Sequence, residues 1–292
     1  MTTVAALLSE SGHADAPLLL AHVLERDRSW LIAHGDDRPR ECDAQRFRSL
    51  LQRRRDGVPV AYLIGSAGFY GRDFLVNQHV LVPRPETEHL VDEALGFITG
   101  AMRVLDVGTG CGAIACTIAA VTGATVDATD VSTAALEVAQ ANARRLRVAD
   151  RCKFYIGDLA RPVAGKRYDV IIANLPYIPS ADLPRPPDPA SFEPRLALDG
   201  GPDGLALYRK LMRDLADLVE PGGIVLLEAA PPTIEELTAL LRTALPNFAI
   251  SVGSDYAGLA RYVKASSKRS SGPRTRTRAS EATRSHGWRE RR

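Results

Sequence analysis

The pattern of apolar positions changes along the chain, from helical spacing in the first 60 residues to short apolar runs beyond residue 86. In the range 43–55 the apolar side chains recur on one helical face. The range 16–24 predicts a second helix, which continues toward Trp30 and Leu31. Residues 1–60 are therefore predicted to form a small N-terminal helical domain. Periodicity alone identifies it only as an amphipathic bundle.

Beyond residue 86, strand-like runs alternate with helix-like segments. The strand-like runs centre near Val104, Val126, Phe154, Val170 and Val225. The helices between or after them are predicted near Ile114, Leu136, Leu205 and Leu237. Because crossovers between parallel strands are right-handed, this order predicts an α/β fold with a mostly parallel sheet and helices on both faces.

Two segments fit neither pattern. Alternating apolar residues with Gly65, Gly68 and Gly71 predict a β-hairpin from Ala61 to Val82 that links the domains. The proline-rich range 179–194 predicts a long irregular loop of the kind that often shapes a site. The predicted organisation is a helical domain at 1–60, a hairpin linker at 61–84, an α/β domain at 85–264 and a tail at 265–292.

The charge of the chain is unevenly distributed. From Lys264 to the C-terminus there are ten basic and two acidic residues (+8), whereas the remainder has 27 basic and 33 acidic residues (−6). The tail lacks large apolar residues almost entirely and is predicted to be disordered. It could make non-specific phosphate contacts with RNA or ribosomes, or serve only as a solubilising extension.

The composition bears on three properties, namely membrane association, metal binding and disulfide bonds. No apolar run approaches 18 residues, and the N-terminus lacks the pattern of a signal peptide, so no membrane association is predicted. The four cysteines show neither metal-ligand spacing nor a disulfide framework. The sequence thus predicts a reduced, cytoplasmic protein without a metal.

The most informative chemistry follows the apolar run near Val170, where the chain continues with Asn174, Leu175, Pro176 and Tyr177. A planar NH2 group, from a glutamine side chain or an adenine, could donate hydrogens to the Asn174 side-chain oxygen and the Leu175 carbonyl. Its plane would stack on Tyr177. The alternative is a strand end closed by an X-Pro turn without a ligand.

A glycine turn follows the strand near Val104 and consists of Gly108, Thr109, Gly110, Cys111 and Gly112. Its G-x-G-x-G spacing differs from the G-x-G-x-x-G of dinucleotide sites, so a pyrophosphate is not the first expectation. Asp130 ends the next strand and could accept both hydroxyls of a ribose. Asp158 follows the third strand, where the edge of an adenine ring would lie. Each acid alone could instead be a helix cap.

This arrangement resembles the class I S-adenosylmethionine-dependent methyltransferases, which have a Rossmann-like fold. The resemblance implies S-adenosyl-L-methionine as cofactor and a final antiparallel edge near Ile250 and residues 261–263. It also implies cofactor binding by Asp106, Gly108, Thr109, Gly110, Cys111, Gly112, Asp130, Asp158, Leu159 and Asn174.

Two further signatures narrow the family. Residues 83–88 read P-R-P-E-T-E, and residues 193–204 contain E-P-R followed by D-G-G-P-D-G. Both resemble the protein-(glutamine-N5) methyltransferases of peptide chain release factors, over the range from about Asp15 to Lys264. The resemblance implies that the helical domain recognises a release factor. It also implies catalysis by Asn174, Leu175, Pro176 and Tyr177, with Arg84 and Glu86 also binding substrate.

The sequence departs from this family at two places near the predicted site, and the range 255–261 matches the family's C-terminal pattern only loosely. Leu175 replaces the first proline of the usual Asn-Pro-Pro-Tyr, and Ala229 to Pro232 replace a glycine and a glutamine after Glu228. The catalytic carbonyl at residue 175 is a backbone group and survives the change. Asn-Leu-Pro-Tyr also resembles the motif of ribosomal RNA adenine dimethyltransferases. Glutamine N5-methylation is therefore predicted, with RNA adenine N6-methylation or a catalytically idle cofactor-binding paralogue as alternatives.

Overall fold

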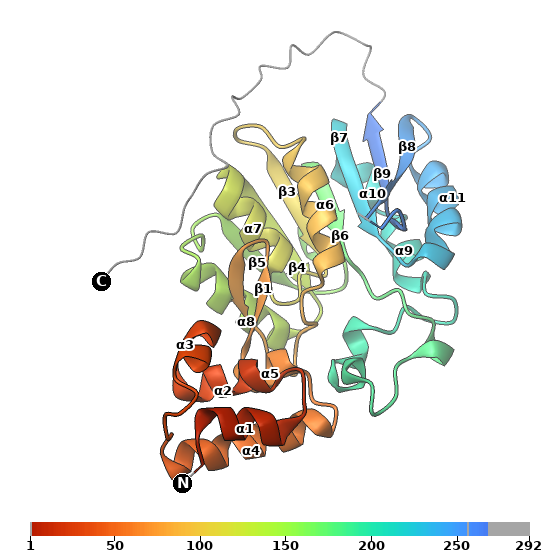
Figure 1. Ribbon diagram of the computed structural model, residues 1–292. Helices are drawn as coiled ribbons and strands as arrows, with labels where there is room; N and C mark the ends of the chain where they lie inside the picture. Colours follow the sequence, from red (N-terminus) through yellow and green to blue (C-terminus); the bar gives the residue numbers. More distant parts are fainter. Residues whose placement is uncertain (1, 256, 268–292) are drawn as a thin grey trace.

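A seven-stranded, mostly parallel sheet forms the centre of the molecule (Figure 1). The computed structural model describes residues 2–255 and 257–267. The strand order is β5-β4-β3-β6-β7-β9-β8, and the neighbouring pairs from β5 through β7 are parallel. The strands are β3 (Arg103–Val107), β4 (Thr125–Asp130), β5 (Cys152–Ile156), β6 (Tyr168–Ala173), β7 (Val219–Glu228), β8 (Phe248–Ser254) and β9 (Ala260–Ser267).

Helices cover both faces of the sheet, as predicted. One face packs against α6 (Pro85–Leu95), α7 (Ala113–Thr122) and α8 (Thr133–Arg145). The other face packs against α9 (Ala206–Leu211), α10 (Leu215–Leu218) and α11 (Ile234–Ala244). Successive residues of β6 alternate between the two cores, with Val170 on one side and Ile171 on the other. Burial on both sides explains why these strands are nearly continuous apolar runs in the sequence.

The final two strands form the predicted antiparallel edge, because β9 pairs antiparallel with both β7 and β8. β9 extends through Ser267, three residues past the boundary predicted for the α/β domain. The predicted disorder of the remaining tail concerns residues 268–292, which lie outside the described residues. Within the part of the chain that the structure describes, no helix is both long and apolar enough to cross a membrane.

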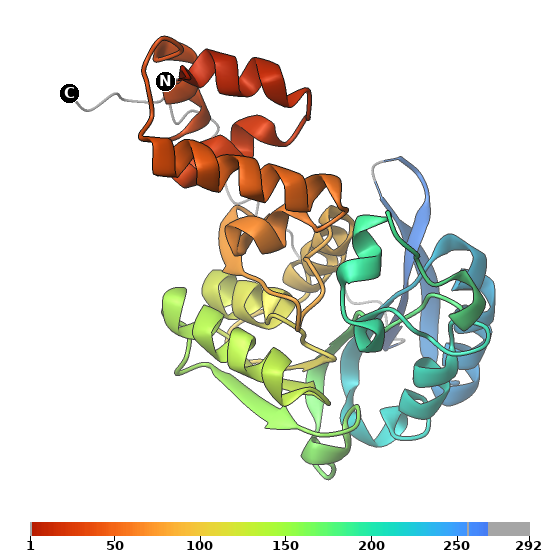
Figure 2. The ribbon, with the colours of Figure 1, turned by 90° about the horizontal axis from the view of Figure 1, so that it is seen from below.

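The N-terminal part consists of five helices around a hydrophobic core of its own. They are α1 (Val4–Ser11), α2 (Ala16–Leu24), α3 (Arg28–Ala33), α4 (Glu41–Arg55) and α5 (Val60–Ile64). Figure 2 shows this group beside the α/β domain. The prediction that the helix from Ala16 continues toward Trp30 is wrong. Glu25 has a left-handed conformation with φ 53°, and Asp27 caps a new helix by accepting from the Trp30 N–H at 2.7 Å.

The hairpin that follows is shorter than predicted. It comprises only β1 (Ser66–Phe69) and β2 (Arg72–Leu75), joined by Tyr70 and Gly71, which both have positive φ. Two successive left-handed residues suit the twist of a tight hairpin. Residues 61–64 belong to α5, and residues 76–82 form no strand. The apolar alternation of residues 76–82 thus reflects burial of Val76 and Val80 without a strand partner.

Candidate functional site

A cavity of about 450 Å³ lies at the C-terminal ends of the parallel strands. This is where parallel α/β sheets bind ligands, because loops and helix N-termini meet there. The structure brings eleven of the predicted site residues to its wall. They are Arg84, Gly108, Thr109, Gly110, Cys111, Asp130, Asp158, Leu159, Asn174, Leu175 and Pro176.

The glycine turn forms one side of the cavity. Gly108, Gly110 and Gly112 all have positive φ, which favours glycine over residues with a side chain. A Cβ on Gly110 would have no heavy atom within 4 Å, so the backbone is open to a ligand there. Gly112 serves a different purpose from the predicted cofactor contact. It packs against α8, where a Cβ would lie 3.1 Å from the Ala139 Cβ.

Asp106 lies beneath the glycine turn and does not line the cavity, contrary to the direct contact predicted for it. Its Oδ2 accepts from the Thr109 hydroxyl at 2.6 Å and from the Ala115 N–H at 3.2 Å. Complete burial raises the Asp106 pKa to about 7, although these two hydrogen bonds oppose the shift. Asp106 therefore holds the turn in place from below.

Asp130 and Asp158 face the cavity, as predicted. The Asp130 carboxylate accepts from the Gly110 N–H at 2.9 Å and from the Ser132 N–H at 2.8 Å. Each of its oxygens keeps a second acceptor position, which could serve a ribose hydroxyl. Burial raises the Asp130 pKa, while these backbone hydrogen bonds act against the shift. Asp158 and Leu159 also line the cavity, and Leu159 has a φ of 50°.

Residues 174–176 line the cavity next to the glycine turn. The Asn174 side-chain amide donates to the Thr87 hydroxyl at 3.0 Å. The Leu175 N–H donates to the Tyr208 hydroxyl at 3.2 Å, and that hydroxyl donates to the Glu228 carbonyl. The Leu175 side chain is buried beside Gly108. Tyr177 does not line the cavity, and burial raises its pKa to about 12.

The glycine-rich stretch at 200–204 packs directly on this tetrapeptide. A Cβ on Gly204 would lie 2.3 Å from the Tyr177 carbonyl oxygen, and one on Gly200 would lie 2.8 Å from the Pro176 carbonyl oxygen. Gly200 also donates its N–H to the Ile178 carbonyl at 2.8 Å. Residues with side chains would force the two segments apart. These glycines therefore allow residues 200–204 to pack directly against the tetrapeptide at 174–177.

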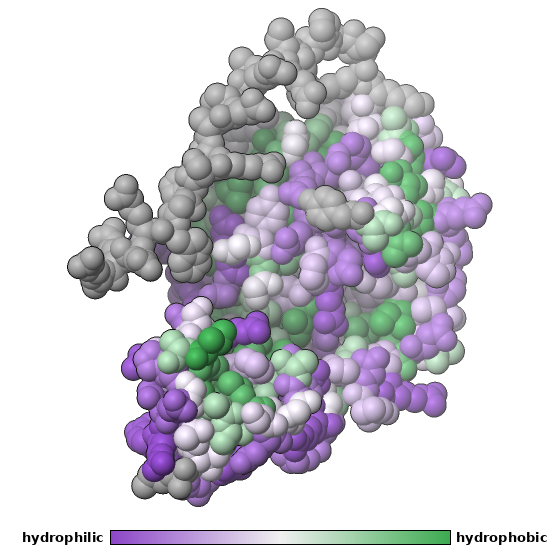
Figure 3. Space-filling view, in the orientation of Figure 1, coloured by the Kyte–Doolittle hydropathy of each residue, from purple (hydrophilic) through white to green (hydrophobic). Residues whose placement is uncertain are grey.

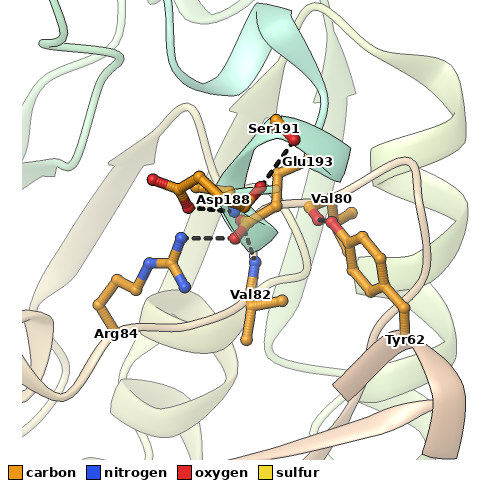
Figure 4. Close-up of polar contacts among 8 residues, drawn as sticks. Tyr62, Val80, Val82, Arg84, Asp188, Ser191 and Glu193 are labelled. Atoms are coloured by element: carbon orange, nitrogen blue, oxygen red, sulfur yellow. Dashed lines mark hydrogen bonds and ion pairs between the residues drawn. The ribbon is translucent and has the colours of Figure 1, made fainter. Parts of the chain in front are cut away.

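The two family signatures meet at one ion pair, shown in Figure 4. The Arg84 Nη2 donates to the Glu193 Oε1 at 2.5 Å, and the Val82 N–H donates to the other carboxyl oxygen at 3.0 Å. The Glu193 side chain is only 2% exposed, and burial raises its pKa against the effect of Arg84. Arg84 therefore anchors the proline-rich loop as well as lining the cavity. Glu86 lies outside the cavity wall, with one carboxyl oxygen 3.8 Å from Arg261.

Four residues that support the site were not predicted to belong to it. Thr87 and Glu228 lie behind Asn174, and Tyr208 holds Leu175. Asn142 on α8 bonds both to the Cys111 carbonyl and to the backbone of Leu75 in the hairpin. The only sequence signals were the position of Thr87 within P-R-P-E-T-E and that of Glu228 after an apolar run.

Comparison with known proteins agrees with this geometry. Residues 4–65 match the family model described as the PrmC N-terminal domain, and residues 88–182 match the methyltransferase small domain. A release factor glutamine methyltransferase of Moorella thermoacetica is 40% identical over 85% of this chain and 89% of its own length. The corresponding enzyme of Bordetella pertussis is 41% identical over 84% of this chain and 92% of its own length.

The solved structures support the fold. A methyltransferase from Pyrococcus furiosus superposes with a TM-score of 0.51 at 21% identity, over 68% of this chain and 90% of that one. At this identity the match establishes the class I methyltransferase fold alone. The sequence relatives go further, since they align with nearly the whole of their own length. The chain belongs to the release factor glutamine methyltransferase family.

Proposed function

We propose that this protein transfers a methyl group from S-adenosylmethionine to the side-chain amide nitrogen of a glutamine in a peptide chain release factor. The observation that carries the proposal is the orientation of Asn174. Its amide nitrogen donates to the Thr87 hydroxyl, while the residue itself lines the cavity beside the glycine turn. The Asn174 Oδ1 is thus available to accept a hydrogen from an acceptor NH2 group.

The residues on the glycine-turn side fit the cofactor. The backbone of Gly110 is open to close approach, and Asp130 retains acceptor capacity for ribose hydroxyls. Asp158 and Leu159 supply the next part of the wall. When bound there, S-adenosylmethionine would supply a methyl group already activated by its sulfonium.

The residues on the acceptor side orient the substrate amide and need not act as a strong base. An amide nitrogen is nearly non-basic, so a fixed orientation and acceptors for its two hydrogens matter more than a strong general base. The Asn174 Oδ1 and the Leu175 carbonyl are proposed to accept these hydrogens. Leu175 retains that carbonyl although it replaces the proline of the family pattern.

The N-terminal helices are proposed to recognise the release factor. Ile32 on α3 is 86% exposed, and Figure 3 shows hydrophobic side chains gathered on this end of the molecule. We expect Ile32→Asp to raise the KM for an intact release factor by about tenfold, as loss of an apolar contact. The same change should leave the rate on a short glutamine-containing peptide unchanged. Equal effects on both substrates would contradict the recognition role.

The decisive experiment offers methyl-labelled cofactor to purified release factor and, separately, to ribosomal RNA. Mass mapping then locates the added methyl group. Label on a glutamine side chain supports the proposal, whereas label confined to adenine would establish the RNA reaction instead. Cofactor binding without transfer to either substrate would identify an idle paralogue.

The basic segment 268–292 lies outside the described residues, so its contact with RNA or ribosomes stays a prediction. Action in the cytoplasm is proposed because release factors work there on ribosomes. A matched pair of full-length and 1–267 enzymes would test whether the segment changes ribosome binding.

A further inference from the structure

Behind Asn174 lies an acidic side chain that the chemistry described above does not use. The Glu228 carboxyl, at the end of β7, is only 3% exposed. Its Oε2 has no hydrogen-bond partner among the described residues. A buried carboxyl with an unsatisfied oxygen is costly, so its presence beside the site calls for a function.

The surroundings of Glu228 connect it to the site through side chains. Thr87 and Asn174 lie beside its carboxyl and stabilise its ionised form, and Asn174 also donates to Thr87 at 3.0 Å. Thr87 is itself only 4% exposed and lies in the first turn of α6. The three side chains come from α6, the end of β6 and the end of β7, and they form one closed cluster.

A second connection runs through the backbone. The Glu228 carbonyl accepts from the Tyr208 hydroxyl, which in turn accepts from the Leu175 N–H. Tyr208 is fully buried, so water does not compete for these bonds. Glu228 therefore supports both halves of the acceptor site, with its side chain beside Asn174 and its carbonyl linked to Leu175 through Tyr208.

The direction of the hydrogen bonds follows from the donors available. An ionised carboxylate can only accept, so the Thr87 hydroxyl must donate to Glu228. The Thr87 oxygen is then an acceptor for one hydrogen of the Asn174 amide, and Glu228 accepts the other. Both amide hydrogens are consumed inside the cluster, and only Oδ1 remains to face the cavity.

We propose that Glu228 is a positioning residue for methyl transfer, which acts through Thr87 to hold Asn174 with its oxygen toward the acceptor amide. This inference rests on the proposed function. It explains why a carboxylate occupies this buried position. A neutral amide at residue 228 could donate to Thr87, and the hydroxyl could then donate to Asn174 Oδ1. The Asn174 side chain would then be free to flip and present its NH2 to the substrate. Two NH2 groups that face each other repel, because both are donors.

Because the proposed positioning requires an ionised Glu228, the rate of methyl transfer should depend on pH. Burial raises its pKa to about 7, against the opposing hydrogen bonds of Thr87 and Asn174. The other charged or titratable groups near it are Glu86 on α6, Arg261 on β9, and Tyr177 and Tyr208. We expect kcat to rise with pH through about 7, as the carboxyl becomes acceptor-only.

The raised pKa of Glu228 also distinguishes a positioning role from a purely structural one, because it predicts how stability depends on pH. The folded-state pKa lies above the ordinary 4.5, so this group favours folding below about 4.5 and loses that contribution as pH rises through about 7. Above pH 7 the Glu228→Gln variant no longer buries an ionised carboxylate. We therefore expect its Tm at pH 8 to equal or exceed that of the parent.

The experiment compares Glu228→Gln, Thr87→Val and Thr87→Ser with the parent on release factor. We expect the first two to lower kcat about tenfold to a hundredfold, less than loss of a direct contact, without changing cofactor affinity. Thr87→Ser keeps the hydroxyl and should retain activity. Thr117→Val is the matched control, because it removes a fully buried hydroxyl on α7 that has no hydrogen-bond partner among the described residues.

The outcomes are distinguishable. A Glu228→Gln enzyme with parental kcat and the parental pH profile would overturn the positioning role. So would a loss of rate that follows a fall in Tm at pH 8. If the parent itself fails to methylate a release factor glutamine, the proposed function fails, whatever the ratio between variants. A low kcat at unchanged Tm, a flat profile near pH 7 and rescue by serine support the inference.

Discussion

The two sides of the cavity are built in different ways. The proposed cofactor side consists mainly of backbone groups in one glycine turn, together with acids at the ends of neighbouring strands. The acceptor side depends on side chains from distant segments, since Asn174 bonds to Thr87 and Leu175 bonds to Tyr208. Binding the cofactor is thus mostly a local property of the chain, whereas orienting the acceptor requires the complete tertiary structure.

The largest expected effect removes the acceptor side directly. Asn174→Ala should lower kcat by roughly two to three orders of magnitude, as when one preorganised polar contact is lost. Cofactor affinity should change little, because the glycine turn stays intact. Single-turnover kinetics and calorimetry measure the two quantities. A large loss of cofactor affinity would show that the two sides are not separable.

A smaller effect is expected on the cofactor side. Asp130→Ala removes an acceptor that also fixes the Gly110 N–H, which should weaken cofactor binding by about 1–3 kcal/mol. With saturating cofactor, kcat on release factor should remain near that of the parent. Unchanged affinity in calorimetry would argue against Asp130 as a ribose acceptor.

The ion pair between Arg84 and Glu193 should affect the free energy of unfolding more than the rate of methyl transfer. Among the described residues, Arg84→Met leaves the nearly buried Glu193 carboxyl with only the Val82 N–H as a hydrogen-bond donor. We expect a loss of about 1–3 kcal/mol in the free energy of unfolding, measured by urea denaturation. Glu193→Gln removes the buried charge together with the pair, so it should cost less. Equal losses in both variants would show that burial of the charge is not the cause.

The smallest effect is expected for Leu175→Pro, which restores the residue of the family pattern. It removes the N–H that donates to the Tyr208 hydroxyl, a loss worth about 0.5–1.5 kcal/mol. The carbonyl proposed as acceptor remains, so activity on release factor should stay within about tenfold of the parent. Abolished activity, with RNA methylation by the parent, would mark an adenine site.

The sequence predicted the cofactor side better than the acceptor side for a physical reason. Gly108, Gly110 and Asp130 act where the chain pattern already places strand ends and turns. By contrast, Thr87 is 87 residues from Asn174, and Tyr208 is 33 residues from Leu175. No local pattern records such pairings, so Tyr208 and Glu228 were missed as supports.

The errors in the fold have similar causes. The break after α2 depends on a left-handed Glu25, a conformation that helical periodicity cannot reveal. The overlong hairpin arose because residues 76–82 alternate as a strand would. Their polar groups are instead bound by other segments, since the Val80 carbonyl accepts from Tyr62 and the Val82 N–H donates to Glu193.

The bond from Arg84 to Glu193 has a consequence for how the enzyme forms. It closes a loop of 109 residues that contains the glycine turn, Asp130 and the tetrapeptide at 174–177. Closing long loops is slow relative to forming local contacts, so this bond should be made late in folding. Asn174 and Thr87 close a similar loop of 87 residues, whereas Gly110 and Asp130 are only 20 residues apart. During refolding, cofactor binding should therefore return before methyl transfer does. A newly made chain would pass through a stage at which it holds its methyl donor but has no place for the acceptor.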